Sequence, residues 1–168
     1  MREILIGAAK SGLYTPLWSP RILEEWARAT RKLGDAQEVF ARGEIADLKA
    51  QFPQASHLPK EGLQARLYLP DADDVHVLAA AITGGADLLI TMNAKDFPRH
   101  TLHEEGLERL SPDMFLFDLL QQHPAEMRAV AQRVHGEAER LSGEVWDMRK
   151  LMKKARLPRF GKALTAQS

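Results

Sequence analysis

Residues 70–98 read PDADDVHVLAAAITGGADLLITMNAKDFP, and this stretch decides the fold. Residues 88–92 form a continuous apolar run, which is typical of a strand buried on both faces of a parallel sheet. The small apolar residues 75–83 predict a helix, and the pair Gly84-Gly85 is typical of its C-terminal end. A helix followed closely by a buried strand is the repeating unit of an α/β fold.

Further elements extend this pattern in both directions. The segments 13–18, which Pro16 interrupts, 63–69 and 107–110 predict additional strands. Helices are expected over residues 2–11, from Ser19-Pro20 to about Gly34, over 37–51, from Pro112 onward, and over most of 124–154. Because strands alternate with helices, the sequence predicts an α/β fold with a parallel sheet.

Length and composition bound the function. The chain has 168 residues, of which 45% are hydrophobic, so we expect one domain of roughly 100 to 150 residues with an appendage. Cysteine is absent, which excludes disulfides, thiolate metal sites and thiol nucleophiles. Residues 1–7 lack the features of a signal peptide, and no apolar run approaches the roughly 20 residues of a membrane span. We therefore expect a cytoplasmic protein with no membrane partner.

The charges are unevenly distributed along the chain. The 23 basic and 23 acidic residues balance, but all seven charged residues from Arg149 onward are basic. Residues 1–148 therefore carry a net charge of minus seven. This basic tail is a candidate for binding phosphate or an acidic protein surface, with Lys150, Lys153, Lys154 and Arg156 as possible RNA contacts. A solvated helix end is the alternative, since cations also favour the last turns of helices.

Three carboxylates are expected at one edge of the predicted sheet. Asp74 follows the expected strand 63–69, Asp96 follows 88–92, and Glu25 lies in the helix after 13–18. Ligands of parallel α/β sheets bind at the carboxyl ends of the strands. Because clustered carboxylates repel one another, a hard divalent cation such as Mg²⁺ or Mn²⁺ is the usual reason to bring them together.

Each carboxylate also has a simpler interpretation. Asp74, or its neighbour Asp73, is at a position where an aspartate commonly caps a helix, and Asp96 is at a position typical of an Asx turn. Glu25 lies roughly 110° from the centre of the apolar arc of its helix, against roughly 150° for Glu24, so Glu25 is the better candidate of the two.

Other catalytic classes are poorly supported. The six histidines show no metal-ligand pairing on an apolar face. The chain has no glycine-rich phosphate loop, because Gly84-Gly85 follows a helix instead of opening one, and no nucleophile elbow. A P-loop enzyme and a serine hydrolase are therefore disfavoured.

The stretch from Pro70 to Pro98 closely resembles the PIN-domain family. The shared features are an aspartate that starts an alanine-rich helix, a glycine turn, a hydrophobic strand, and then Thr-x-Asn-x-x-Asp-Phe. Residues 17–26 resemble the second strand of the family and its following helix. The resemblance covers residues 1–118 and implies a three-layer fold, a parallel sheet flanked by helices, with a helical extension carrying the basic tail over 119–168.

The resemblance also implies a function. PIN domains are metal-dependent ribonucleases and include toxins of bacterial toxin-antitoxin pairs. It implies cleavage of single-stranded RNA with Mg²⁺ or Mn²⁺, an antitoxin partner and a homodimer. It further implies Glu25, Asp74 and Asp96 as catalytic metal ligands, with Thr91 and Asn93 as supporting polar groups.

One departure from the family pattern leaves alternatives open. The family begins with a strand that ends in a metal-binding aspartate, whereas this sequence opens in the helix that follows. Either the true start lies about 20 residues upstream of Met1, or the chain is a shortened relative. The absence of that first aspartate is the reason to keep a catalytically weak RNA- or protein-binding module as an alternative. A phosphotransfer or phosphatase domain of the same α/β type is a more distant one.

Overall fold

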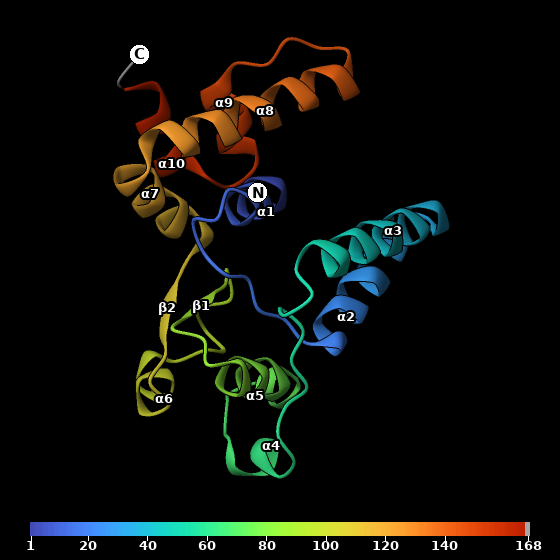
Figure 1. Ribbon diagram of the computed structural model, residues 1–168, viewed down its shortest axis with the longest axis vertical. Coiled ribbons are helices and arrows are strands. Elements are labelled where there is room, and N and C mark those ends of the chain that lie inside the picture. Colours follow the sequence, from blue (N-terminus) through green and yellow to red (C-terminus); the bar gives the residue numbers. More distant parts are fainter. Residues whose placement is uncertain (167–168) are drawn as a thin grey trace. The chain divides into compact units, whose positions relative to one another are not determined.

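The computed structural model describes residues 1–166 and is rich in helices (Figure 1). The strands are β1 (Leu88–Ile90) and β2 (Glu108–Leu110), and two 3₁₀ helices are η1 (Arg31–Leu33) and η2 (Ala72–Asp74). The α-helices are α1 (Arg2–Lys10), α2 (Pro20–Thr30), α3 (Asp35–Gln51), α4 (Leu63–Arg66), α5 (Val75–Gly84), α6 (Arg99–Glu104), α7 (Pro112–Gln122), α8 (Pro124–Ser142), α9 (Met148–Lys154) and α10 (Pro158–Thr165).

The α/β class is confirmed, with a small parallel sheet. Strand β1 pairs with β2. The Glu108 N–H donates to the Asp87 carbonyl at 3.0 Å, and the Thr91 N–H donates to the Leu110 carbonyl at 3.1 Å. The two strands that the sequence predicts near 88–92 and 107–110 are therefore present, each three residues long.

The strand predicted over residues 63–69 is wrong. Residues 63–66 form the short helix α4, which follows Gly62 in a left-handed conformation. Leu63, Gln64, Ala65 and Arg66 are all strong helix formers, so local propensity explains the helix. Only Leu67 and the residues after it are extended or irregular before η2.

The strand predicted over residues 13–18 is reduced to one parallel bridge between Trp18 and Ser56. The Trp18 N–H donates to the Ala55 carbonyl, and the His57 N–H donates to the Trp18 carbonyl. Pro16 has no N–H to contribute to a ladder, which explains why pairing begins only at Trp18. The helical stretch predicted over 124–154 is likewise divided, because Gly143 ends α8 with φ of 68°.

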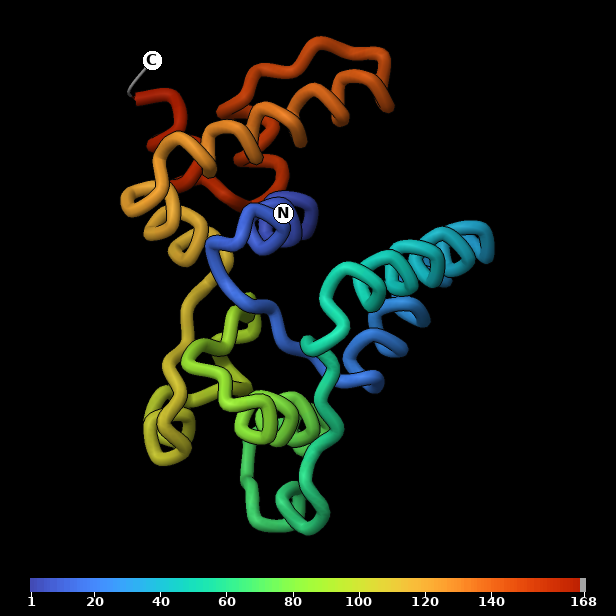
Figure 2. The backbone as a smooth tube through the Cα atoms, viewed as in Figure 1, coloured from blue at the N-terminus to red at the C-terminus, as the bar shows by residue number. Residues whose placement is uncertain are grey.

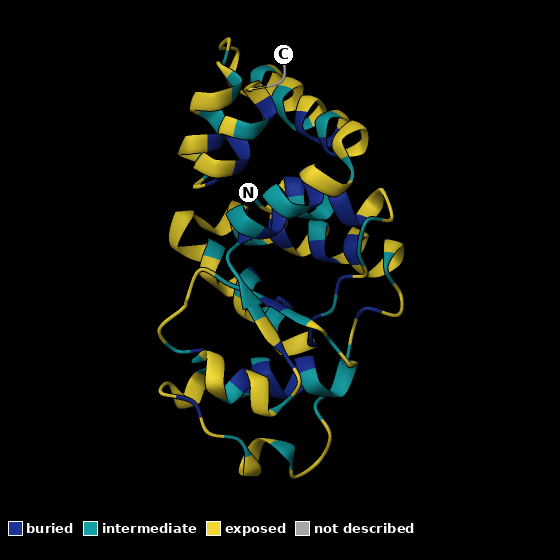
Figure 3. Ribbon diagram, turned by 90° about the vertical axis from the view of Figure 1, so that its left-hand side faces the viewer, coloured by how far each residue is buried: buried dark blue, intermediate teal, exposed yellow. Residues whose placement is uncertain are grey.

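The chain forms two compact units. The central unit contains residues 16–89 and 93–109. Its α2 and α3 pack against each other as a hairpin (Figure 2). A second part of its interior is formed by buried side chains around α5, β1 and α6: Leu69, Leu78, Ala81, Leu89, Phe97, Leu102 and Leu107. The longer helices carry both buried and exposed residues, whereas the short helix α4 has no buried residue (Figure 3).

The helical unit contains residues 1–15, 90–92 and those from 110 onward. In it α1 packs on α8, and α10 packs on both α7 and α9. A Cβ added to Gly7 would lie 2.7 Å from Cγ1 of Val130, so glycine permits the close contact of α1 with α8. None of the helices within residues 1–166 is both long and apolar enough to cross a membrane.

These two units are defined by contacts within the chain. The sequence predicts a different kind of division, between a domain over residues 1–118 and a helical extension over 119–168. That division stays a prediction. The last two residues of the predicted extension, Gln167 and Ser168, lie outside the described part of the chain.

Candidate functional site

Three aspartates of the central unit come together at one site. Asp71 is the N-cap residue of η2, Asp74 is its last residue, and Asp96 lies in the loop after β1. One carboxylate oxygen from each lies within 4.8 Å of those of the other two. We call Asp71, Asp74 and Asp96 the aspartate cluster.

The two aspartates of η2 have different local roles. Asp71 Oδ1 accepts a hydrogen bond from the Asp73 N–H at 2.9 Å, so Asp71 is the residue that caps the turn. Asp74 precedes α5 but makes no capping hydrogen bond with its side chain. Its Oδ2 instead accepts a hydrogen bond from Asn93 Nδ2 at 3.1 Å. The helix-cap interpretation of this run therefore applies to Asp71 and not to Asp74.

The cluster carries unbalanced negative charge. Burial raises the pKa of Asp74 above its ordinary value, and the carboxylates of Asp71, Asp96 and Glu25 raise it further, while His76 opposes the shift. The raised pKa means that the protein surroundings do not fully compensate the ionised form of Asp74. A divalent cation would supply the missing compensation.

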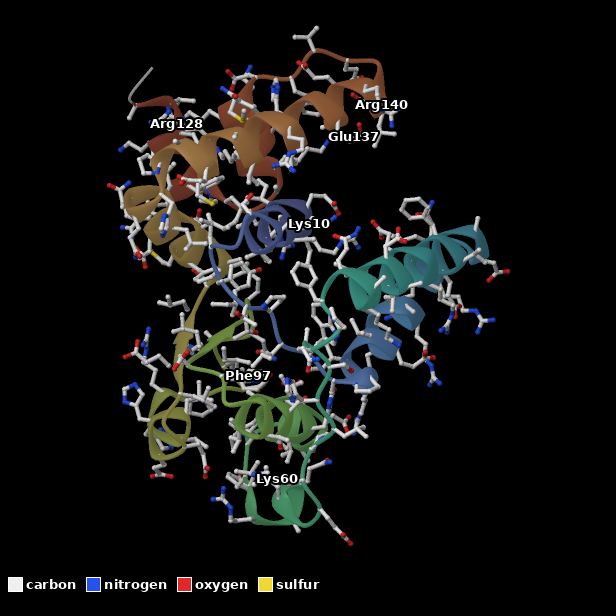
Figure 4. The ribbon with its side chains drawn as sticks, in the orientation of Figure 1. Lys10, Lys60, Phe97, Arg128, Glu137 and Arg140 are labelled. Carbon is white, nitrogen blue, oxygen red and sulfur yellow. The ribbon has the colours of Figure 1, made fainter. Side chains whose placement is uncertain are left out.

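The loop that carries Asn93 and Asp96 is held from two sides. The side chain of Arg109, on β2, donates hydrogen bonds to the carbonyls of Ala94 and Phe97. The Phe97 ring, labelled in Figure 4, is only 3% exposed and belongs to the buried interior next to Asp96. Because both anchors flank Asp96, they fix the backbone from which its carboxylate projects.

Glu25, on α2, pairs with His76 and Arg21 and is not a member of the aspartate cluster. Its Oε1 lies 3.2 Å from Nε2 of His76 and 2.8 Å from Nε of Arg21. Its carboxylate also contributes to the raised pKa of Asp74. Glu24 lies elsewhere: it forms ion pairs with Arg28 of its own helix and with Arg42 of α3.

His76 is a buried residue of α5 that contacts Glu25 of α2. Its side chain is 3% exposed, and among the described residues its Nδ1 has no hydrogen-bond partner. Burial lowers the pKa of His76, against the opposing effect of Glu25. The imidazole is therefore neutral near pH 7. Its Nε2 lies where an N–H on that nitrogen can donate a hydrogen bond to the Glu25 carboxylate.

The remaining residues singled out from the sequence lie outside the aspartate cluster. Thr91 directly follows β1 in the helical unit, and its N–H donates to the Leu110 carbonyl. The candidate RNA contacts lie on α9 and in the turn that follows it: Lys150, Lys153, Lys154 and Arg156. The roles of these five residues stay predictions.

Sequence reasoning missed three members of the site. Asp71 was passed over, although residues three apart lie on the same side of a 3₁₀ turn, so Asp71 and Asp74 could have been paired from their spacing. His76 follows Asp74 by two residues, but its contact with Glu25 depends on how α2 packs near α5. Arg109 acts through backbone carbonyls that lie 12 and 15 residues away, which no local pattern indicates.

The donor set fits a hard divalent cation. All of its ligand atoms are carboxylate oxygens, which Mg²⁺ and Mn²⁺ prefer over imidazole or sulfur. The three aspartates come from two segments that the fold brings together, η2 and the loop after β1, whereas Glu25 of α2 is not among the carboxylates that lie within 4.8 Å of one another. Asp71 is exposed and Asp74 and Asp96 are partly exposed, so the cluster is accessible to solvent.

Comparison with known proteins agrees with this geometry. A family described as "PIN domain" matches residues 2–95, a region that includes Glu25, Asp71 and Asp74 and ends one residue before Asp96. A protein of Mycobacterium tuberculosis (strain ATCC 25618 / H37Rv), named "Putative ribonuclease VapC50", is 40% identical over 57 residues. That region covers 34% of this chain and 34% of the relative, so the similarity spans about a third of each. No solved structure matches the chain.

Proposed function

The chain belongs to the PIN domain family, and from this premise we propose that it is a metal-dependent endoribonuclease that cleaves phosphodiesters of single-stranded RNA. The observation that carries the proposal is the aspartate cluster, in which three carboxylates approach within 4.8 Å inside a PIN domain. The mycobacterial relative bears the name of a ribonuclease, which supports RNA as the substrate. We place the nuclease domain at residues 1–118 and its helical extension at 119–168.

The residues have distinct roles in this proposal. Asp74 and Asp96 hold Mg²⁺ or Mn²⁺, Glu25 completes the ligand set from α2, and Asp71 adds a fourth carboxylate that the sequence did not single out. When bound, such an ion supplies Lewis acidity, which activates water and offsets charge on the leaving oxygen. Asn93 orients the Asp74 carboxylate through the 3.1 Å hydrogen bond, and Thr91 is a supporting polar group.

The partners follow from the same premise. We propose that the chain is the toxin component of a toxin-antitoxin pair, restrained by a cognate antitoxin protein, and that it forms a homodimer. Light scattering coupled to gel filtration tests the homodimer, with a mass of twice 18.8 kDa as the expected result. A monomeric mass would contradict that part of the proposal.

Cleavage of a mixed-sequence single-stranded RNA tests the enzymatic proposal. We expect cutting with Mn²⁺ or Mg²⁺ that EDTA abolishes and that Asp96→Asn reduces by at least about a hundredfold, since a lost ligand removes much of the Lewis acidity. Asp73→Asn is the matched control, because Asp73 is an exposed neighbour outside the aspartate cluster. RNA binding without divalent-dependent cutting would contradict the proposal and indicate a binding module instead.

A further inference from the structure

Seven basic residues and no acidic residue lie between Met148 and Ala166. All seven side chains are exposed: Arg149, Lys150, Lys153, Lys154, Arg156, Arg159 and Lys162. Lys154 stacks over the Trp146 ring, and Arg159 stacks over the Phe117 ring. Within residues 1–166 the other five form no ion pair. This surplus of positive charge is therefore not used to stabilise the fold through salt bridges.

The cations lie on the outer faces of two packed helices. On α9 they fall within about 140° of arc, and the buried Met152 lies on the opposite side. On α10 Arg159 and Lys162 are about 60° apart, opposite the buried Phe160 and Leu164. Both helices are thus amphipathic, with an apolar face toward the unit and a cationic face toward solvent.

Helix electrostatics explains only some of these cations. Lys153, Lys154 and Lys162 lie in last turns, where the helix dipole favours positive charge. Arg149, Lys150 and Arg159 lie in first turns, where the dipole disfavours it. A solvated helix end therefore does not account for this pattern.

The turn between α9 and α10 contains a further cation, Arg156, whose backbone conformation is unfavourable for a residue with a side chain. Arg156 is the one non-glycine residue with positive φ, at 61°, within the described part of the chain. It occupies the position after a helix where glycine or asparagine is usually found. A strained backbone with a long cationic side chain points to a role for that side chain.

The helices are fixed in place and do not form a loose tail. The Asp113 carboxylate, from α7, accepts hydrogen bonds from the N–H groups of Arg159 and Phe160 at 3.0 and 2.9 Å. Arg128 of α8, labelled in Figure 4, donates to the Leu164 carbonyl at 3.0 Å. A Cβ on Gly161 would lie 2.6 Å from Cβ of Met152, so α9 and α10 are in very close contact.

We propose that the outer faces of α9 and α10 bind the phosphate backbone of RNA. Several exposed cations on two closely packed helices suit a polyanion such as the phosphate backbone, whose contacts do not depend on the bases. This inference rests on the proposed function for the identity of the polyanion, but the cations belong to the helical unit and not to the aspartate cluster. RNA affinity and RNA cleavage therefore depend on different residues and can be tested apart.

The test measures binding of a fluorescent single-stranded RNA by anisotropy, in EDTA, over a range of salt concentrations. Lys150→Gln with Lys153→Gln removes two charges from α9. We expect affinity at 0.1 M salt to fall on the order of tenfold, and the slope of log affinity against log salt to become shallower by about 1.4, since each lost phosphate contact in single strands contributes about 0.7. The control is Lys10→Gln with Lys60→Gln, which removes equal charge from exposed lysines elsewhere (Figure 4).

The outcomes separate the proposals. Equal RNA binding by the α9 variant and the control overturns the backbone-binding surface, as does absence of RNA binding by the unaltered chain. Binding of poly-glutamate that the α9 variant loses, with RNA binding unchanged, would assign the surface to an acidic protein instead. EDTA-resistant RNA binding that needs Lys150 and Lys153, without cutting in Mn²⁺, would support this surface while contradicting the nuclease proposal.

Discussion

At the scale of single residues, each side chain of the site makes a different contact. Asp71 caps η2, Asp74 is left for a ligand, and Asn93 holds one of its oxygens. His76 is buried against Glu25, whose other partner, Arg21, is exposed to solvent. These roles can be separated by substitution.

Replacement of His76 by leucine tests its positioning role. His76→Leu keeps an apolar side chain of comparable size in the buried position but removes the Nε2 contact with Glu25. We expect the Mn²⁺ concentration for half-maximal RNA cleavage to rise about tenfold, because residues that orient metal ligands typically contribute that much. Arg21→Gln should change it little, since the pair of Arg21 with Glu25 is screened by solvent. Equal effects of the two changes would contradict the role of His76.

Substitution of Asp71 tests its role as the cap of η2. Asp71→Ala and Asp71→Asn both remove a charge that repels Asp74, but only Asp71→Ala also removes the hydrogen bond to the Asp73 N–H. Asp71→Ala should therefore have a free energy of unfolding about 1 kcal/mol lower than that of Asp71→Asn, which retains a side-chain acceptor. Chemical denaturation in EDTA measures both. A comparable loss in the two variants would show that the cap is not what Asp71 supplies to stability.

At the scale of elements, α2 and α3 are joined by an exposed charge network. Hydrogen bonds from Arg42 and Arg28 lower the pKa of Glu24 from 4.5 to about 2. A carboxyl with a lowered pKa stabilises the fold above its unfolded value, and this contribution fades as pH falls toward the folded value. Glu24→Gln should therefore lower Tm by a constant amount above about pH 5, and the difference should vanish by about pH 2. A pH-independent difference would contradict the ionic origin.

The pair α9 and α10 depends on a glycine. Gly161→Ala would place a Cβ 2.6 Å from Cβ of Met152, so it should cost about 1 to 3 kcal/mol of unfolding free energy. Gly136→Ala is the matched control in α8, where an added Cβ meets nothing within 4 Å. It should stabilise by about 0.5 to 1 kcal/mol, because alanine favours helices. A neutral Gly161→Ala, measured by urea denaturation, would show that the two helices can separate.

Helix ends were readily predicted from local chemistry. Ser19 caps α2 ahead of Pro20 as the sequence indicates, and Gly85 ends α5 in a left-handed conformation. The segment 63–66 forms a helix and not the predicted strand, because its four residues favour helix and its length does not distinguish a short strand from one helical turn. The segment 13–18 forms no strand because a strand needs a pairing partner, and among residues 1–166 only Ser56 forms a bridge with it.

At the scale of the whole molecule, a net charge of zero hides two opposite features. The aspartate cluster belongs to the central unit, and the cationic faces of α9 and α10 belong to the helical unit. The sequence indicated the basic run and two members of the cluster, Asp74 and Asp96, because both patterns are local, but it did not single out Asp71. It could not predict the contacts that assemble the site, such as His76 with Glu25 or Arg109 with the loop at 94–97, because these depend on tertiary packing.

Calorimetric titration of Mn²⁺ into the RNA-free chain tests most directly whether the aspartate cluster holds a divalent ion. The unaltered chain and Asp73→Asn should bind Mn²⁺ with the same affinity, because Asp73 is outside the cluster. Asp74→Asn should bind at least about tenfold more weakly, since it removes a charged oxygen ligand. Equal Mn²⁺ binding by Asp74→Asn and Asp73→Asn, or no binding by the unaltered chain, would contradict a metal centre at these aspartates.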